Sequence, residues 1–267
     1  MRDVAVIGVG MQRWGELWKQ SLREIFVESA LLAMDDAGID KLEAMYVGSM
    51  SPGLFAAQEH IGSLLADYLG QAPIPGTRVE SACASGGLAF RMAFMDVASG
   101  MHDIVLAGGV EKMTDISGGE ATFALSTAAD MKWEGTCGVT FPGLYAMIAR
   151  AHMEAHGTTE EDLAWVAVKN HRHGAMNPKA HLRKVVSEEK IKAAPMIAYP
   201  LGLFDCCGVS DGSACAIVTT VEKAKAMGMR VVSWDLSRKD APFVDKQYMA
   251  QDLSNFLRES DYVVVVL

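Results

Sequence analysis

Short apolar runs alternate along the chain with segments in which apolar residues recur every three or four positions. The runs are mostly apolar and only a few residues long, which is typical of strands that are buried on both faces of a sheet. The helical patterns between them predict an α/β fold, with a mostly parallel sheet layered with helices. The predicted strands are Val4–Ile7, Ala44–Val47, Arg78–Ser81, Asp103–Ala107 and Ala214–Thr219.

Two helix starts are marked by polar residues at capping-box spacing. Ser21 is followed three residues later by Glu24, and Gly38 stands where the helix that begins there is expected to stop. Thr158 and Glu161 show the same spacing, which predicts a second helix start.

The alternation of strands and helices is interrupted in the middle of the chain. Residues 109–200 carry helical patterns but no convincing strand, so we interpret them as a large insertion or loop domain between two sheet strands. A composition break near residue 228 divides the chain into a domain at 1–228 and a short fragment at 229–267. The fragment is expected to form a strand, a helix at 251–260 and a last strand at 261–267.

Composition and charge narrow the function classes. The 267 residues are 50% apolar and 21% charged, which is typical of a globular protein, and the net charge of −9 disfavours a nucleic-acid partner. No apolar run reaches the roughly 18 to 20 residues of a membrane span, and the first residues form no secretory signal. Five cysteines, an odd number, favour free thiols and a cytoplasmic location.

Cys83 is the strongest candidate for chemistry. It stands in a turn between a predicted strand and a predicted helix, and small residues follow it at 84–87. The N–H groups and positive dipole end of a helix favour a thiolate there, and the thiolate is the nucleophile. Small neighbours let an acyl group or cofactor approach the backbone. These features alone leave open a buried cysteine that only fills the strand–helix junction.

Four motifs resemble the thiolase family in the order expected for it. They are ESACASGG, DIVLAGGVEKM, the segment from FPGLYAM to HRHGAMNP, and DGSACAIV. The resemblance is greatest to the archaeal and sterol-carrier-protein-like branch and covers about residues 1–228. It implies a thiolase-like N-terminal half and an acyl-CoA acyltransferase of the acetyl-CoA acetyltransferase kind.

The resemblance also assigns roles to residues. Cys83 would take the acyl group from acyl-CoA or acetyl-CoA, with the CoA thioester as substrate and no tightly bound cofactor. Residues 114–200 would be the family's inserted helical loop domain, which covers the pantetheine of CoA. Phe141, Gly143 and Ser85 would line the CoA and acyl pocket, and Phe141 stands where many thiolases carry histidine. The turn that supports the nucleophile would comprise Gly108, Gly109, Glu111 and Met113.

The second half of a thiolase brings a histidine and a second cysteine that act as acid and base. Nothing after residue 228 resembles those motifs, so we expect impaired activity, because a positioned acid–base partner is often worth about 10²- to 10⁴-fold. The alternative is a non-catalytic thiolase-like chain that needs a partner chain. The family implies dimers or tetramers, and we expect a homo-oligomer or association with another chain.

Residues 229–267 resemble a different family, the D-2-hydroxyacid dehydrogenases. MRVVSWDLSRK is similar to the second strand of their dinucleotide-binding unit, with Asp235 where an acid meets the ribose. The glycine-rich phosphate turn is absent, so binding of NADH is disfavoured. We interpret the tail as an orphan fragment joined near residue 228.

No metal site is expected. His152 and His156 stand four residues apart on a predicted helix but lack further ligands at metal-binding spacing. Cys206 and Cys207 are adjacent and favour structural thiols over a strained disulfide. A condensing enzyme that acts on acyl carrier protein is also disfavoured, because its nucleophile is usually surrounded by more serines.

Overall fold

A five-stranded sheet forms the body of the protein. The computed structural model describes residues 1–234 and 244–260, and all five predicted strands are present. Their order across the sheet is β1 (Val4–Met11), β7 (Gly212–Thr220), β4 (Ile104–Glu111), β2 (Ala44–Gly48) and β3 (Gly76–Val79). β2 runs parallel to β3 and β4, whereas β7 is antiparallel to β1 and β4. Four strands therefore share one direction, as the mostly parallel prediction requires, and β7 opposes them.

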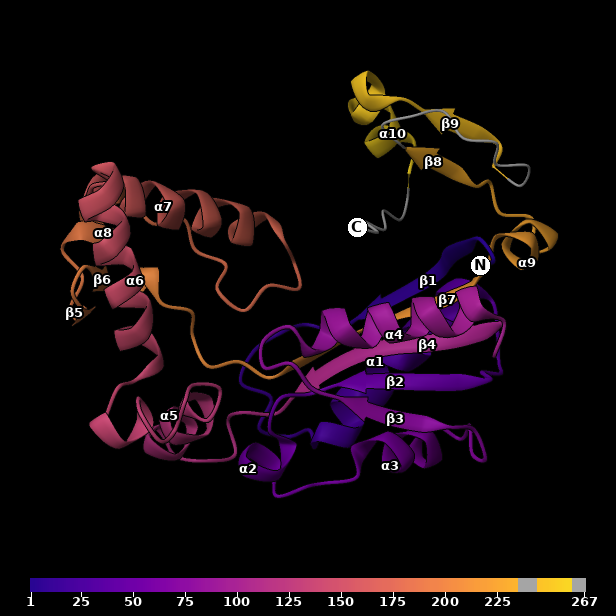
Figure 1. Ribbon diagram of the computed structural model, residues 1–267, viewed down its shortest axis with the longest axis horizontal. Helices are drawn as coiled ribbons and strands as arrows, with labels where there is room; N and C mark the ends of the chain where they lie inside the picture. Colours follow the sequence, from indigo (N-terminus) through magenta and orange to yellow (C-terminus); the bar gives the residue numbers. More distant parts are fainter. Residues whose placement is uncertain (235–243, 261–267) are drawn as a thin grey trace.

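Helices cover both faces of this sheet (Figure 1). α1 (Leu22–Ala37) and α3 (Ile61–Tyr68) pack on one face, where Phe26 and Ile25 are fully buried with Ile7, Leu106 and Ile217. α4 (Ser85–Ser99) packs on the other face, and the short α2 (Pro52–Ala56) follows β2. The sheet is thus packed between two layers of helices, with one apolar cluster on each of its faces.

The predicted capping of α1 is confirmed. Ser21 and Glu24 form a capping box, and Gly38 ends the helix in the left-handed conformation at φ +65°. The second capping box lies one residue later than predicted, because Thr159 and Asp162 form it at the start of α7 (Glu160–Met176). The Thr158 hydroxyl is instead bonded to His152 Nδ1 at 3.0 Å.

The excursion between β4 and β7 is mostly helical, as expected. Figure 1 shows α6, α7 and α8 beside the sheet, reached by the chain that leaves β4. The prediction of no strand was wrong in one detail, since a two-stranded pair forms before the chain returns to β7. The elements are α5 (Gly118–Ser126), η1 (Gly135–Cys137), α6 (Phe141–His156), α7, α8 (Glu188–Lys192), β5 (Met196–Ala198), β6 (Leu201–Gly202) and η2 (Leu203–Asp205).

A short α9 (Val221–Ala226) follows β7 and leads to a small C-terminal unit. The predicted strand after residue 229 is present as β8 (Val232–Trp234), and the predicted helix as α10 (Leu253–Glu259), preceded by η3 (Ala250–Asp252). β9 (Lys246–Tyr248), which pairs in parallel with β8, was not predicted. Asp235 and the expected strand at 261–267 lie outside the described residues. No helix in the described part of the chain is long and apolar enough to cross a membrane.

Candidate active site

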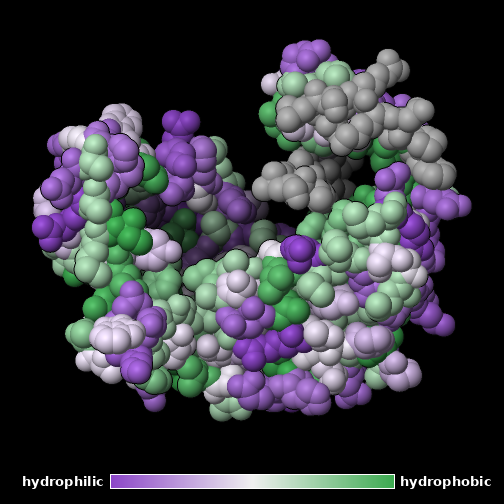
Figure 2. Space-filling view, in the orientation of Figure 1, coloured by the Kyte–Doolittle hydropathy of each residue, from purple (hydrophilic) through white to green (hydrophobic). Residues whose placement is uncertain are grey.

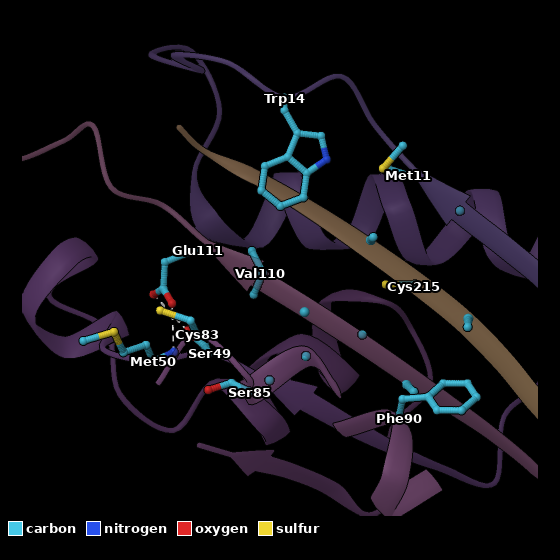
Figure 3. Close-up of a pocket in the computed structure, with 18 of the residues that line it drawn as sticks. Met11, Trp14, Ser49, Met50, Cys83, Ser85, Phe90, Val110, Glu111 and Cys215 are labelled. Atoms are coloured by element: carbon cyan, nitrogen blue, oxygen red, sulfur yellow. Dashed lines mark hydrogen bonds between the residues drawn. The ribbon is translucent and has the colours of Figure 1, made fainter. Parts of the chain in front are cut away.

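A pocket of about 770 Å³ opens on the sheet where α4 begins. Figure 2 shows that this face of the molecule is hollowed between the helices of the excursion and the sheet. Cys83 lines the pocket together with residues from the ends of β2 and β4 (Figure 3). The lining is predominantly apolar and includes Met11, Trp14, Met50, Phe90, Val110 and Met113.

A strained turn presents Cys83 to this pocket. Ala82 adopts the left-handed conformation at φ +47°, which is unusual for a residue with a side chain, and Cys83 is exposed. The Ser85 hydroxyl holds the turn closed: it donates to the Ala82 carbonyl at 2.6 Å and accepts from the Ser81 N–H at 2.9 Å. The thiol therefore projects from a fixed turn directly before the N-terminus of α4.

The Ser85→Ala substitution removes the hydrogen bond from the Ser81 N–H and one of two bonds to the Ala82 carbonyl, which keeps the bond from the Ser85 N–H at 3.2 Å. We expect it to lower the free energy of unfolding by about 1–3 kcal/mol, because two hydrogen bonds of about 0.5–1.5 kcal/mol each are lost. A urea titration followed by circular dichroism measures the change. Ser99→Ala, which removes a similar hydroxyl bond at the other end of α4, serves as the matched control. An unchanged midpoint for Ser85→Ala would contradict the role given to this hydroxyl.

Glycines allow α4 to approach the sheet closely. A Cβ at Gly48 would lie 2.3 Å from the carbonyl oxygen of Ser85 and 2.6 Å from the nitrogen of Gly86. Gly109 faces the same helix start more loosely, since its nearest contact would be the Cα of Gly86 at 3.5 Å. The first turn of α4 therefore packs directly against the backbone of these two glycines, at the ends of β2 and β4.

Glu111 anchors the loop on the other side of Cys83. Its carboxylate accepts from the Ser49 hydroxyl at 3.0 Å and from the Met50 N–H at 2.8 Å. Burial raises the pKa of Glu111 above its ordinary value, although the bonds from Met50 and Ser49 counteract part of that effect. Arg78 holds the same loop by donating to the carbonyls of Ser49 and Met50. Figure 3 shows Cys83, Ser49 and Glu111 at one end of the pocket.

The described pocket lining contains an exposed thiol but no imidazole. Its ionisable side chains are Cys83, Glu111, Lys179 and Cys215, and no histidine is among the lining residues of the described chain. Cys215 is buried, and this burial raises the pKa of its thiol to about 12, which favours the protonated thiol at neutral pH. Cys83 is therefore the thiol of this pocket that is placed to react.

The structure brings together some predicted site residues and separates others. Cys83 and Ser85 line the pocket, and so do the predicted supporting residues Gly108, Gly109, Glu111 and Met113. Phe141 and Gly143 do not line it, because they lie in the first turn of α6. The Gly143 N–H there donates to the Thr140 hydroxyl at 3.3 Å, which caps the helix.

The residues weighed as metal ligands are separate from this pocket. The rings of His152 and His156 lie 4.5 Å apart on α6, and Cys206 and Cys207 are free thiols. Across residues 1–234 and 244–260, no group of three or more His, Cys, Asp or Glu side chains is placed to hold a metal ion.

Sequence reasoning missed a buried ion pair beside the site. Lys112 and Asp211 are both fully buried, with Lys112 Nζ 2.8 Å from Asp211 Oδ2. Thr114 bonds to both of them, at 2.7 Å from Lys112 and 2.6 Å from Asp211. The other carboxylate oxygen of Asp211 accepts the N–H groups of Met113 and Thr114. The pair thus joins the end of β4 to the start of β7, where the chain leaves and re-enters the sheet.

The electrostatics of this pair follow from its contacts. Burial opposes the charge on Asp211, but hydrogen bonds from Lys112 and Thr114 outweigh it and lower the pKa of Asp211. Burial likewise opposes the charge on Lys112, yet the carboxylates of Asp115 and Asp211 raise the pKa of Lys112. Both groups are charged at neutral pH. In the structure Lys112 directly follows β4 and Asp211 directly precedes β7, whereas the predicted strands end at Ala107 and begin at Ala214, so the sequence patterns did not mark the pair.

Fold and site together define an α/β protein with an exposed, pocket-lining cysteine at a strand–helix turn. The Thiolase, N-terminal domain family model matches residues 4–222. The chain therefore belongs to the thiolase family.

The relatives include two acetyl-CoA acetyltransferases. That of Methanothermobacter thermautotrophicus is 54% identical over 227 residues, which cover 84% of this chain and 59% of the relative. That of Methanocaldococcus jannaschii is 50% identical, with 84% and 57% covered. The benzoylsuccinyl-CoA thiolase subunit BbsB of Thauera aromatica is 33% identical, with 86% and 58% covered. The chain thus spans less than three fifths of the length of these relatives.

Solved structures show the same fold. The Ltp2-ChsH2(DUF35) aldolase has a TM-score of 0.70 at 26% identity, over 84% of this chain and 57% of the other. Human mitochondrial 3-ketoacyl-CoA thiolase in complex with CoA has a TM-score of 0.64 at 15% identity, over 85% and 67%. The second likeness concerns the fold alone. Together they support the thiolase-like N-terminal half that the sequence predicts.

Proposed function

We propose that this chain is a thiolase-type acyltransferase half, in which Cys83 accepts the acyl group of an acyl-CoA such as acetyl-CoA. The observation that carries this proposal is the exposed Cys83 on a strained turn, at the start of α4 and in an apolar pocket. The relatives described as acetyl-CoA acetyltransferases support acetyl-CoA as the substrate. No tightly bound cofactor is part of the proposal.

The residues around Cys83 fit the first step of such a reaction. The sulfur attacks the thioester carbonyl carbon, a new carbon–sulfur bond forms, and the bond to the CoA sulfur breaks. The thiol proton leaves with the CoA sulfur, so that CoA departs as a thiol. The N-terminus of α4 favours negative charge on the attacking sulfur and on the developing oxyanion. Glu111 and Arg78 hold the opposite loop, and the apolar lining excludes water from the thioester.

The later carbon–carbon chemistry needs a positioned acid–base group, and no histidine stands among the described residues of the pocket lining to serve as one. We propose that this group comes from a second thiolase half or from another chain, and that this chain alone is impaired in turnover. The second candidate function is accordingly a non-catalytic subunit. The relative described as a thiolase subunit and the two names in the description of the Ltp2-ChsH2(DUF35) aldolase support association with another chain.

Several finer assignments belong to the same proposal. Phe141 and Gly143, at the start of α6, would contact the CoA when the loop domain at 114–200 covers it. A location in the cytoplasm fits the five free cysteines. Residues 229–267 would be a fragment of D-2-hydroxyacid dehydrogenase type; the parallel pairing of β8 and β9 is compatible with such a unit.

Release of free CoA tests acyl transfer without requiring turnover. Mixing the chain with acetyl-CoA should release up to one equivalent of CoA per chain, measured by chromatography, and Cys83→Ala should release none. Cys137→Ala, which removes another exposed thiol, is the control and should behave as wild type. Absence of release from folded wild-type chain would favour the non-catalytic subunit. Equal release from Cys83→Ala would remove Cys83 from the mechanism.

A further inference from the structure

The pocket of Cys83 continues as a groove along the face of the sheet that α4 covers. Figure 3 shows Cys83 and Glu111 at one end of the pocket and Phe90, from the second turn of α4, at the other. Ala107 lines the pocket four residues before Glu111 on β4 and packs in the same apolar cluster as Phe90. At about 3.3 Å per strand residue, the groove is therefore about 13 Å long.

Small side chains leave this space free on the sheet. Side chains alternate between the two faces of a strand, and a Cβ at Gly108 would lie 2.7 Å from both Cys215 Sγ and the ring of Phe26 in α1. Gly108 and Cys215 therefore face α1, and the strand residues on either side of them face α4. These residues form the floor of the groove and are Ala107, Gly109, Ala214 and Ala216. Since none of them carries a side chain larger than a methyl group, the space between α4 and β1 stays open.

Apolar residues form the two walls of the groove. α4 supplies one wall, and β1 with the loop after it supplies the other; the residues are Gly86, Phe90, Val9, Met11 and Trp14. The Trp14 ring packs against Gly212, where a Cβ would lie 2.3 Å from the ring. The backbone N–H of Trp14 also donates to the Lys179 carbonyl at 2.9 Å. The wall opposite α4 is thus held in place by the start of β7 and by the excursion.

The charged groups of the lining lie in the half of the groove near Cys83. Glu111 is bonded there within the loop that it anchors. The Lys179 ammonium donates to the carbonyl of Met11, which is level with the middle of the groove through the pairing of β1, β7 and β4. Beyond Met11, toward Phe90, the described part of the lining carries no carboxylate or ammonium group. A hydrocarbon chain can be buried there, whereas a charged chain end would lose its hydration without gaining a partner.

We propose that this groove receives the acyl chain of the thioester and selects unbranched hydrocarbon chains of about eight carbons. The proposal rests on the acyl transfer to Cys83 proposed above. Three bonds of an extended chain span about 3.3–3.6 Å, or roughly 1.2 Å per bond, so an eight-carbon chain attached to Cys83 extends about 10 Å toward Phe90. An acetyl group occupies only the beginning of the groove. Each further methylene that leaves water strengthens binding in an apolar pocket.

A series of CoA thioesters tests the groove, with release of CoA measured as above. Octanoyl-CoA should reach its half-maximal rate of release at a concentration at least about tenfold lower than acetyl-CoA, because six more methylene groups are buried. Suberoyl-CoA, which has the same chain length and a terminal carboxylate, should need a concentration at least about tenfold higher than octanoyl-CoA.

The outcomes separate the groove from acyl transfer itself. Octanoyl-CoA that is used no better than acetyl-CoA, or suberoyl-CoA that matches octanoyl-CoA, would overturn the groove and leave acyl transfer to Cys83 standing. Absence of release from every thioester would overturn acyl transfer, and the groove with it.

Two variants change the length of the groove in opposite directions. Ala216→Phe places a ring across its far half and should abolish the preference for octanoyl-CoA over acetyl-CoA. Phe90→Leu opens the far end and should shift the preference toward dodecanoyl-CoA. Ala155→Phe adds the same ring at an exposed position of α6 outside the lining and should keep the wild-type preference. Wild-type preference in both groove variants, verified as folded by circular dichroism, would overturn the proposal; if Ala216→Phe does not fold, Phe90→Leu alone decides.

Discussion

Asp211→Ala is expected to lower the free energy of unfolding by about 3–5 kcal/mol, the usual cost of breaking one side of a buried ion pair. Asp211 is fully buried, and its loss leaves Lys112 charged and without this partner at the base of the excursion. It also releases the N–H groups of Met113, Thr114 and Leu17. Because Met113 lines the pocket, the site should loosen together with the fold.

Chemical denaturation measures this change, and Asp115→Ala is the matched control. Asp115 also pairs with Lys112, at 2.7 Å, but its side chain is 46% exposed, so water can replace it and the loss should stay below about 1 kcal/mol. Equal effects of the two variants would contradict the importance given to the buried partner.

The same pair predicts a dependence of stability on pH. The pKa of Asp211 is lower in the folded chain than its ordinary value of 3.8, so the ionised carboxylate favours folding. That contribution is fully present above pH 3.8 and is lost as the pH falls through the lowered value. Wild type should therefore lose more stability on acidification than Asp211→Asn, which a urea titration at several pH values measures. Parallel losses would contradict the prediction.

Gly48→Ala adds a single methyl group but is expected to slow acyl transfer to Cys83 strongly. Its methyl group would lie 2.3 Å from the carbonyl oxygen of Ser85, so the start of α4 must shift away from β2. Overpacking of this kind costs about 1–3 kcal/mol in stability. The shift also moves the turn of Cys83, and a displacement of about 1 Å costs on the order of 10²-fold in rate. The measurement is the rate of CoA release from acetyl-CoA.

Gly109→Ala is the matched control, since it adds the same methyl group at the neighbouring strand end. Its nearest contact would be the Cα of Gly86 at 3.5 Å, an ordinary van der Waals distance. We expect a near wild-type rate and stability. If both variants react alike, close contact between Gly48 and α4 does not position the nucleophile.

The sequence was sufficient to locate the five strands of the sheet, because each buried strand is a short local run of apolar residues. All five runs became strands, and the turn at Cys83 was visible from the small residues that follow it. The capping box at Ser21 was correct for the same reason, since its contacts are local. At Thr159 the prediction was one residue early, because the Thr158 side chain bonds to His152 on another helix.

Contacts between residues far apart in the sequence could not be predicted from local patterns. The direction of β7 depends on how the chain returns from the excursion, and β5 and β6 pair only because the chain folds back there. The Lys112–Asp211 pair joins residues 99 positions apart. Phe141 and Gly143, assigned to the CoA pocket by resemblance, lie in the first turn of α6, and their contact with CoA stays a prediction.

Peptide mapping after reaction with acetyl-CoA identifies the cysteine that accepts the acyl group. We expect one acetyl thioester, removed by hydroxylamine, on the peptide that carries Cys83. The exposed thiols of Cys137 and Cys207 are internal controls and should stay free, because they are outside the pocket. A thioester spread equally over the three cysteines, or absent from Cys83, would contradict the assignment of this turn as the acyl acceptor.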